Sequence, residues 1–183
     1  TTKIYTLSLH DALPIYKKET VNMDLHQKAA LITGGARMGE TIALALAKRG
    51  ADVILTYRTS KQAAESTAKK INLIGRKAFT VKADLTRSKD QNRVVALCKK
   101  KFGQLDILVH LASIYKAVPF GRLKEKDWDL NTDAHLKSAY GLALAVSSVM
   151  KKSGQGRIIF FSDWTCASNR SEERRVGKEC RSR

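Results

Sequence analysis

Short apolar runs alternate with amphipathic helical segments along this chain, and the alternation limits it to a small set of folds. Five runs have the length and composition of buried strands: residues 29–33, 53–55, 77–82, 105–110 and 157–161. Four segments between them have the apolar spacing of helices: residues 40–49, 59–70, 89–102 and 126–151. A glycine follows each helical segment, where helices commonly end: Gly50, Gly75, Gly103 and Gly154.

This alternation predicts an α/β fold with a parallel sheet, because each connection between neighbouring parallel strands needs a crossover, usually a helix. We expect a Rossmann-type, doubly wound sheet with the strand order 3-2-1-4-5, truncated after strand 5. In such a sheet a ligand binds beyond the carboxyl ends of the strands, near the change of order between strands 1 and 4.

The composition fits one domain without membrane contact. The chain has 183 residues, 43% of them hydrophobic, which suffices for a buried core. No stretch reaches the roughly 18 apolar residues that a membrane helix requires. Cys98, Cys166 and Cys180 are odd in number and form no CxxC pair. This pattern disfavours a disulfide framework and a metal site, and it favours a reducing, cytoplasmic location.

The formal net charge of +17 raises the question of a polyanionic partner. The basic residues are scattered, however, and residues 99–101 form the only tight lysine run away from the ends. Aromatic residues make up only 7% of the chain, too few for a platform on which bases stack. We therefore favour a lysine-rich surface with one anionic ligand over a nucleic-acid partner.

The two ends of the chain are related to each other at the level of DNA. Residues 5–15 can be written as a nucleotide string whose reverse complement, with one flanking base at each end, encodes residues 170–180. The string also resembles a common sequencing-library adapter. We therefore expect residues 1–15 and 170–183 to be non-native, around a domain at residues 16–169 that is incomplete at its carboxyl end.

A glycine-rich loop joins the first predicted strand to the first predicted helix. Its residues are Thr33, Gly34, Gly35, Ala36, Arg37, Met38 and Gly39. Glycines at such a junction let the backbone approach a pyrophosphate, whose charge the amino end of the helix stabilises. These seven residues are therefore candidate cofactor-binding residues.

The end of the second predicted strand carries no acid. Folds that bind NAD usually place a carboxylate there for the ribose hydroxyls. Here Arg58, Thr59 and Ser60 follow the strand, and with Arg37 they could hold a 2′-phosphate through charge-assisted hydrogen bonds. The alternative is that Arg58 is only an exposed arginine at the end of a strand. The pattern favours NADP(H) as the cofactor.

Three further motifs stand near the later strands. They are Ala83-Asp84-Leu85-Thr86, Val109-His110-Leu111-Ala112-Ser113 and Gly156-Arg157-Ile158-Ile159. Together with the loop at residues 33–39, they resemble in order and placement the motifs of the short-chain dehydrogenase/reductase family. The resemblance implies an oxidoreductase in which Asp84 and Leu85 contact the adenine, and His110 and Ala112 belong to the cofactor site.

The chain departs from this family at several positions. The glycine loop is one residue shorter and lacks its middle glycine, and His110 and Leu111 replace two asparagines. His135 stands where the family has a helix asparagine of the proton relay, and Asp163 stands at the catalytic serine. His135 and Asp163 are therefore the candidate catalytic residues. The alternative for His135 is a structural hydrogen bond, and the alternative for Asp163 is a helix cap or a solvated acid. An aspartate at this place resembles pteridine reductases.

In the family, a tyrosine gives a proton to the substrate, and a lysine four residues later lowers the pKa of that tyrosine. This pair is expected near position 176, where Gly177 and Lys178 lie inside the adapter-like end. Tyr57 and Lys61 have the spacing, but they lie at the end of the second strand, near the predicted adenosine phosphate. We therefore expect the chain as printed to be catalytically inactive.

The resemblance thus implies an NADPH-dependent reductase of a carbonyl or of an imine, pterin-type substrate. One alternative is a 3-oxoacyl-carrier-protein reductase, whose acidic carrier would suit the basic surface. Another is a non-catalytic nucleotide- or nucleic-acid-binding domain. Full-length relatives are expected to form homo-dimers or homo-tetramers. Apart from these functions, we expect Met38, Trp128 and Met150 to be core residues.

Overall fold

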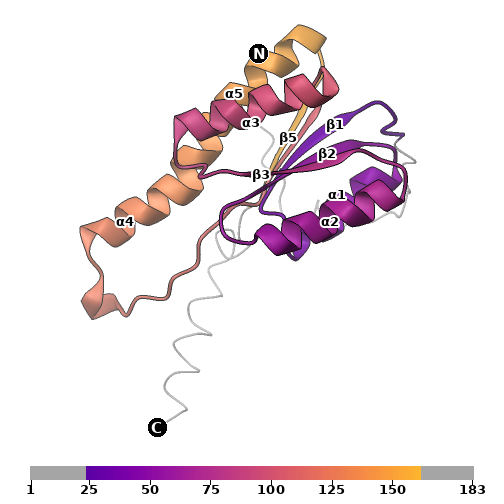
Figure 1. Ribbon diagram of the computed structural model, residues 1–183. Coiled ribbons are helices and arrows are strands. Elements are labelled where there is room, and N and C mark those ends of the chain that lie inside the picture. Colours follow the sequence, from indigo (N-terminus) through magenta and orange to yellow (C-terminus); the bar gives the residue numbers. More distant parts are fainter. Residues whose placement is uncertain (1–23, 162–183) are drawn as a thin grey trace, which may run out of the picture.

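The computed structural model describes residues 24–161, which form a parallel sheet with helices on both faces (Figure 1). The sheet has the order β3-β2-β1-β4-β5. Its strands are β1 (Ala29–Thr33), β2 (Asp52–Tyr57), β3 (Ala78–Lys82), β4 (Ile107–His110) and β5 (Arg157–Phe160). All four pairings are parallel, so the predicted fold class and strand order are confirmed. The two ends expected to be adapter-derived lie outside the described residues.

Helices cover both faces of the sheet (Figure 1). Figure 1 shows α1 (Met38–Lys48) and α2 (Lys61–Leu73) on one face, and α3 (Ser88–Phe102) and α5 (Ser138–Ser153) on the other. The shorter elements before α5 are η2 (Phe120–Arg122), α4 (Glu125–Asn131) and the π-helical segment η3 (Thr132–Lys137). Gly103 and Gly154 end α3 and α5 in the left-handed conformation, as their places in the sequence predict.

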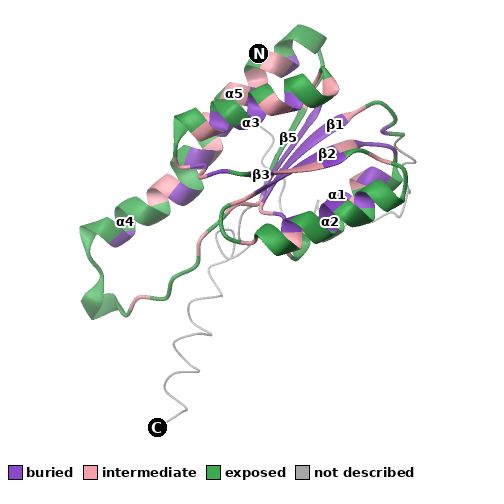
Figure 2. Ribbon diagram, in the orientation of Figure 1, coloured by how far each residue is buried: buried purple, intermediate pink, exposed green. Residues whose placement is uncertain are grey.

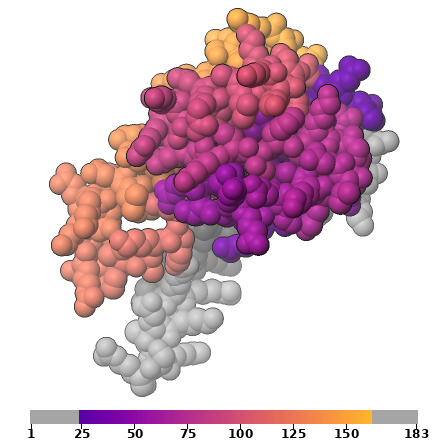
Figure 3. Space-filling model, viewed as in Figure 1, coloured from indigo at the N-terminus to yellow at the C-terminus, as the bar shows by residue number. Residues whose placement is uncertain are grey.

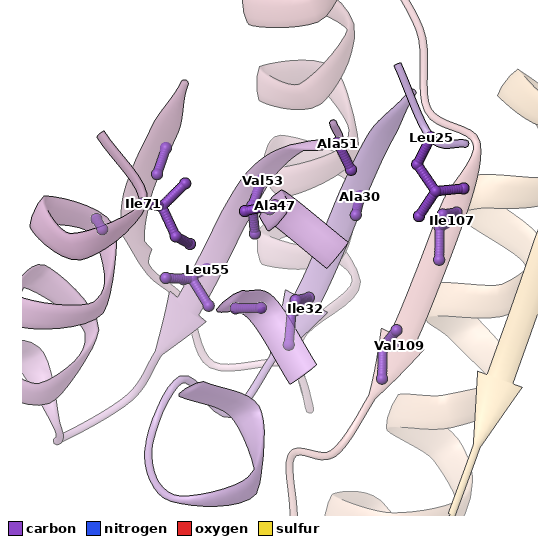
Figure 4. Packing of buried hydrophobic residues seen from close by; sticks show 13 residues of the cluster. Leu25, Ala30, Ile32, Ala47, Ala51, Val53, Leu55, Ile71, Ile107 and Val109 are labelled. Atoms are coloured by element: carbon purple, nitrogen blue, oxygen red, sulfur yellow. The ribbon is translucent and has the colours of Figure 1, made fainter. Parts of the chain in front are cut away.

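The sheet separates two apolar cores, and both lie in the buried interior of Figure 2. One core joins the strands to α1 and α2 through residues that include Ala30, Ile32, Val53, Leu55, Ala47 and Ile71 (Figure 4). The other joins them to α3 and α5 through residues that include Leu31, Ile54, Leu108, Val94, Leu142 and Val146. Every residue of β1 is buried, as expected for a strand covered on both faces. This packing fixes the carboxyl ends of the strands next to one another.

Two local predictions differ from the structure. The helix expected at residues 126–151 is interrupted by η3. The apolar spacing of the sequence does not indicate the π-helical turns of this segment. The helix expected at residues 59–70 is α2, which begins at Lys61 and continues to Leu73; Ser60 occupies its N-cap position, but the side chain makes no capping hydrogen bond. The helix therefore begins without the stabilisation that a side-chain cap would add.

The expectation that Met38 and Trp128 are core residues is wrong, while Met150 is indeed buried. Met38 is 55% exposed, because it stands in the first turn of α1 at the open end of the sheet. Trp128 is 73% exposed, because α4 projects from the body of the molecule (Figures 1 and 3). Its helix therefore has no layer of the described protein to pack against.

A row of exposed apolar side chains continues from α4 into α5. It consists of Trp128, Leu136, Tyr140 and Leu144. At the edge of the sheet, the residues of β5 are also exposed. Among residues 24–161, no helix is both long enough and apolar enough to span a membrane.

Candidate functional site

A cleft of about 500 Å³ lies at the carboxyl ends of the strands, where the order of the sheet changes between β1 and β4. Its walls come from the loops after β1, β2, β3 and β4 and from the start of the long helix. The lining residues are Gly34, Ala36, Arg37, Met38, Gly39, Thr56, Tyr57, Arg58, Thr59, Ser60, Ala83, Asp84, Leu85, Thr86, Leu111, Ala112, Ser113, Ile114, Tyr115, Ala134 and Ser138. The predicted location of the ligand site is the location of this cleft.

The glycine loop after β1 presents backbone donors to the cleft. Arg37 is the N-cap of α1 and makes no side-chain capping bond. Among residues 24–161, the N–H groups of Ala36, Arg37 and Met38 have no backbone acceptor. A side chain at Gly39 would collide with the carbonyl oxygen of Gly34, only 1.9 Å from an added Cβ. The loop is thus a close turn with uncapped donors at a positive helix end, which suits a phosphate group.

The backbone of Arg37 is strained in this turn. Its φ of 49° and ψ of −108° lie in a region that favours glycine. Sparsely populated backbone conformations of this kind cost about 1–3 kcal/mol. The shortened loop explains the strain, because it places an arginine where the turn requires a positive φ.

Replacing Arg37 with glycine is therefore expected to raise the free energy of unfolding by about 1 kcal/mol, because glycine tolerates the positive φ. Urea denaturation measures this change. Arg49→Gly is the matched control, since Arg49 has a φ of −91° and should lose stability with the same substitution. Equal losses in both variants would show that the turn at Arg37 is unstrained.

The loop after β2 places a cation beside the cleft. Arg58, Thr59 and Ser60 all line it, and Arg58 and Thr59 are exposed. Asp84 is the acid among the residues that line the cleft, and its carboxylate is already hydrogen-bonded to Thr86. Asp84 Oδ1 accepts hydrogen bonds from the N–H of Thr86 at 3.2 Å and from its hydroxyl at 2.8 Å. The guanidinium of Arg58 therefore remains available to an anionic ligand.

The same contacts set the charge state of Asp84. The hydroxyl of Thr86 holds the pKa of Asp84 below its ordinary value, with smaller contributions from the positive charges of Arg87 and Arg58. Asp84 is thus a carboxylate at neutral pH. Its role within the described residues is to close the turn after β3, and that turn forms part of the wall of the cleft.

Beneath the cleft, a chain of hydrogen bonds connects β1, β4 and α5. Thr33 Oγ1 accepts the N–H groups of Leu111 and Ala112, each at 3.0 Å. Its hydroxyl proton is then left for His110 Nδ1, at 3.1 Å. His110 Nε2 lies 3.3 Å from Ser138 Oγ, which donates to the carbonyl of Ala134. This arrangement requires a neutral His110 that carries its proton on Nε2.

Burial favours the same neutral form. His110 is 6% exposed, and this burial lowers its pKa to about 4, with a smaller contribution from the nearby His135. An added proton on Nδ1 would also face the hydroxyl of Thr33, whose lone pairs already accept two N–H groups. Thr33 and His110 thus support the floor of the cleft from below, and neither is among the residues that line it.

Of the two candidate catalytic residues, the structure describes His135 alone. His135 lies in η3, and its Nε2 is 3.1 Å from the carbonyl oxygen of Ile114, to which it must donate. This bond ties the helix to the loop that follows β4, beside the cleft. Asp163 lies outside the described residues. Within them, no cluster of three or more potential metal ligands is present.

Most of the predicted cofactor residues meet at the cleft, but three do not reach its lining. Thr33, Gly35 and His110 are buried behind it. The sequence analysis does not predict that Thr56 and Tyr57 line the cleft. Both directly precede Arg58 at the carboxyl end of β2, and this position is a signal that could have identified them. Ala134 and Ser138 were also not predicted, and these could not have been found because η3 changes the helical spacing that brings them to the cleft.

A Rossmann-like sheet with a glycine loop and an open cleft at its switch point defines a class of nucleotide-binding folds. The family model of the short chain dehydrogenases matches residues 28–172. The chain belongs to this short-chain dehydrogenase/reductase family of oxidoreductases.

Known proteins of the family resemble the chain over much of its length. A short-chain dehydrogenase/reductase of Cladobotryum is 38% identical over 114 residues, which are 62% of this chain and 44% of that protein. A 3-oxoacyl-[acyl-carrier-protein] reductase of Staphylococcus epidermidis is 33% identical over 133 residues, which are 72% and 54% of the two chains. The chain thus spans about half the length of the curated relatives it matches.

Solved structures agree with this assignment. A short-chain dehydrogenase from Burkholderia cenocepacia, in complex with NADP, is 33% identical with a TM-score of 0.67, over 69% of this chain and 52% of that one. A short-chain alcohol dehydrogenase described as putative, from Sinorhizobium meliloti, is 33% identical with a TM-score of 0.69, over 74% and 54%.

Proposed function

We propose that the chain is the nucleotide-binding part of an NADPH-dependent oxidoreductase that reduces a carbonyl or an imine, pterin-type substrate. The observation that carries the proposal is the basic rim of the cleft. Arg37 and Arg58 stand at the loops after β1 and β2, beside uncapped donors of α1 and without an acid at the end of β2. The related Burkholderia dehydrogenase that holds NADP supports the choice of cofactor.

The residues of the cleft fit the nucleotide in two places. The N–H groups before α1 would hold the pyrophosphate, and Arg58 with Thr59 and Ser60 would hold a 2′-phosphate. The turn at Asp84 and Leu85 would lie against the adenine. NADPH supplies the hydride when it is bound. The protein groups beyond it would orient the substrate and move the proton.

Two residues are proposed for that proton chemistry. His135 already donates to Ile114 and would position the loop beside the substrate, while Asp163 would orient the substrate or relay a proton. The printed sequence contains no tyrosine after Tyr140. We therefore expect this chain to bind NADPH without catalysing hydride transfer, since the proton donor of the family contributes about 10²–10⁴-fold to such reactions.

Equilibrium binding at physiological salt tests the proposal. NADPH, NADH and a DNA duplex are titrated separately, and the proposal expects NADPH to bind at least tenfold more tightly than NADH. DNA binding with a steep salt dependence and no NADPH binding would instead support the nucleic-acid alternative. Equal affinity for the two nucleotides would contradict the NADP preference.

A second candidate is a 3-oxoacyl-carrier-protein reductase, favoured by the Staphylococcus relatives of that name. It differs from the first in its substrate, which is carried by an acidic protein. The basic surface of this chain would attract such a carrier. Salt-dependent binding of an acyl carrier protein would favour this candidate, and binding of a free pterin without it would favour the first.

The proposed partner is a second copy of the chain, seated on the exposed row of Trp128, Leu136, Tyr140 and Leu144. These residues are 55–73% exposed, and they lie at intervals of four or eight residues along α4, η3 and α5. Large apolar side chains gathered on one surface usually mark an interface. We therefore expect a homo-dimer, or a tetramer built from it, through these helices.

Replacing Leu144 with lysine is expected to weaken this dimer about a hundredfold, because the interface would have to bury an unpaired charge. Sedimentation over a range of concentrations measures the dissociation constant. Leu73→Lys is the control, since Leu73 is 86% exposed on α2, away from the row. A Leu144→Lys chain that dimerises like the Leu73→Lys chain would contradict the proposed interface.

A further inference from the structure

A buried glutamine links the turn after β3 to the helix layer behind it. Gln91 lies in the first turn of α3 and is 5% exposed. Its Nε2 donates to the backbone carbonyl of Leu85 at 2.7 Å. Leu85 belongs to the wall of the cleft, whereas Gln91 does not. The amide therefore reaches the site through the backbone of another residue.

The other side of the same amide rests against α5. A Cβ added at Gly141 would lie 2.4 Å from Gln91 Oε1 and 2.9 Å from its Nε2. Contacts this short cannot form, so any side chain at Gly141 would displace the amide of Gln91. Glycine in the middle of a helix costs stability relative to alanine. Its presence in α5 is explained by the space that Gln91 needs.

Asp90, the neighbour of Gln91, holds the same turn at another point. Its Oδ2 accepts the N–H of Asp84 at 2.8 Å. Two side chains at the start of α3 are thus hydrogen-bonded to the backbone of the turn at residues 84 and 85. Gln91 in addition lies against α5 at Gly141, whereas the side chain of Asp90 is partly open to solvent. Gln91 therefore links the packing of α5 at Gly141 to the wall of the cleft at Leu85.

We propose that Gln91 is a positioning residue for the adenosine end of the cleft, and that Gly141 keeps it in place by having no side chain. This inference rests on the proposed nucleotide-binding function. Without the amide, the buried carbonyl of Leu85 loses its donor and the turn shifts to find another. The wall that should lie against the adenine then moves with it.

A double-mutant cycle tests the pairing of the two residues. The variants are Gln91→Ala, Gly141→Ala and the double variant, and isothermal titration measures their affinity for NADP⁺ and for adenosine 2′,5′-bisphosphate. Each single variant is expected to lose about tenfold in affinity, the effect of one unsatisfied buried carbonyl. The double variant should also lose only tenfold, because alanine at position 91 leaves room for the new methyl group.

The same loss for both ligands is expected, because the adenosine half is common to them. Gly121→Ala is the matched control, since an added Cβ there meets no atom within 4 Å. It should leave the affinity unchanged. A hundredfold loss in the double variant would overturn the pairing, and so would single variants that unfold more easily but bind with wild-type affinity.

Failure of the proposed function has a different outcome. In that case the wild-type chain binds neither nucleotide. Hydrogen exchange at the amides of Leu85 and Thr86 then tests the inference alone. Faster exchange in Gln91→Ala and Gly141→Ala, with no further increase in the double variant, supports it. Unchanged exchange in both single variants overturns it.

Discussion

Replacing Arg58 with alanine is expected to lower the affinity for NADPH by about ten- to a hundredfold, since a hydrogen bond to a charged group contributes about 1.5–3 kcal/mol. The affinity for NADH should stay almost unchanged, because NADH has no phosphate at the 2′ position. Fluorescence titration of the two reduced nucleotides measures both constants. The ratio between them is the quantity that the loop after β2 controls.

Arg49→Ala provides the matched control for this experiment. Arg49 is an exposed arginine at the carboxyl end of α1, at the opposite end of that helix from the cleft. Its removal lowers the net charge by the same amount, so it corrects for the general attraction of a basic protein for an anion. If the two variants lose NADPH affinity equally, Arg58 does not recognise the 2′-phosphate.

Acidification from pH 7 to pH 4 is expected to cost the chain about 3 kcal/mol of unfolding free energy through His110 alone. The pKa of His110 is about 4 in the folded chain, against an ordinary value of 6.5. Between these values the unfolded chain binds the proton and the folded chain does not. The contribution is therefore fully present above pH 6.5, and it is lost as the pH falls towards 4.

Urea denaturation at a series of pH values measures this loss. His110→Asn is the appropriate comparison, because the amide oxygen stands near the position of Nδ1 and can still accept from Thr33, while the side chain does not titrate. Asp84 and Asp90 have lowered pKa values, so their contributions are lost mainly below pH 4 and do not overlap. A His110→Asn chain with the same pH dependence as the wild type would show that His110 is not the group responsible.

The sheet could be predicted almost completely from the sequence, because buried strands and terminating glycines are local features. The run at residues 29–33 is β1 without any change of its bounds. The break in the long helix at η3 could not be predicted, since a π-helical turn depends on contacts such as that between His135 and Ile114. The exposure of Trp128 also follows from the placement of α4, which apolar spacing alone does not reveal.

For the candidate site, the sequence indicates which loops meet but not which atoms face the cleft. Position and charge at the end of β2 agree in predicting an anion site at Arg58, and this residue lines the cleft. The sequence predicts a cofactor contact for His110, but this residue lies behind the lining of the cleft and is hydrogen-bonded to Thr33. Gln91 has no local pattern to mark it. Its importance follows from a contact with Gly141, 50 positions away in the sequence.

The strand order also determines when each side of the sheet can be completed during synthesis on the ribosome. β2 can pair with both β1 and β3 once residue 82 has been made, and α1 and α2 can cover one face. The other edge of β1 stays unpaired until β4 has been made, some 77 residues after β1. Leu31 and Ile54 face α3 and α5, so they remain uncovered by α5 until residue 153. A nascent chain of intermediate length therefore exposes one apolar face of a half-built sheet, which makes it a natural client for a ribosome-associated chaperone.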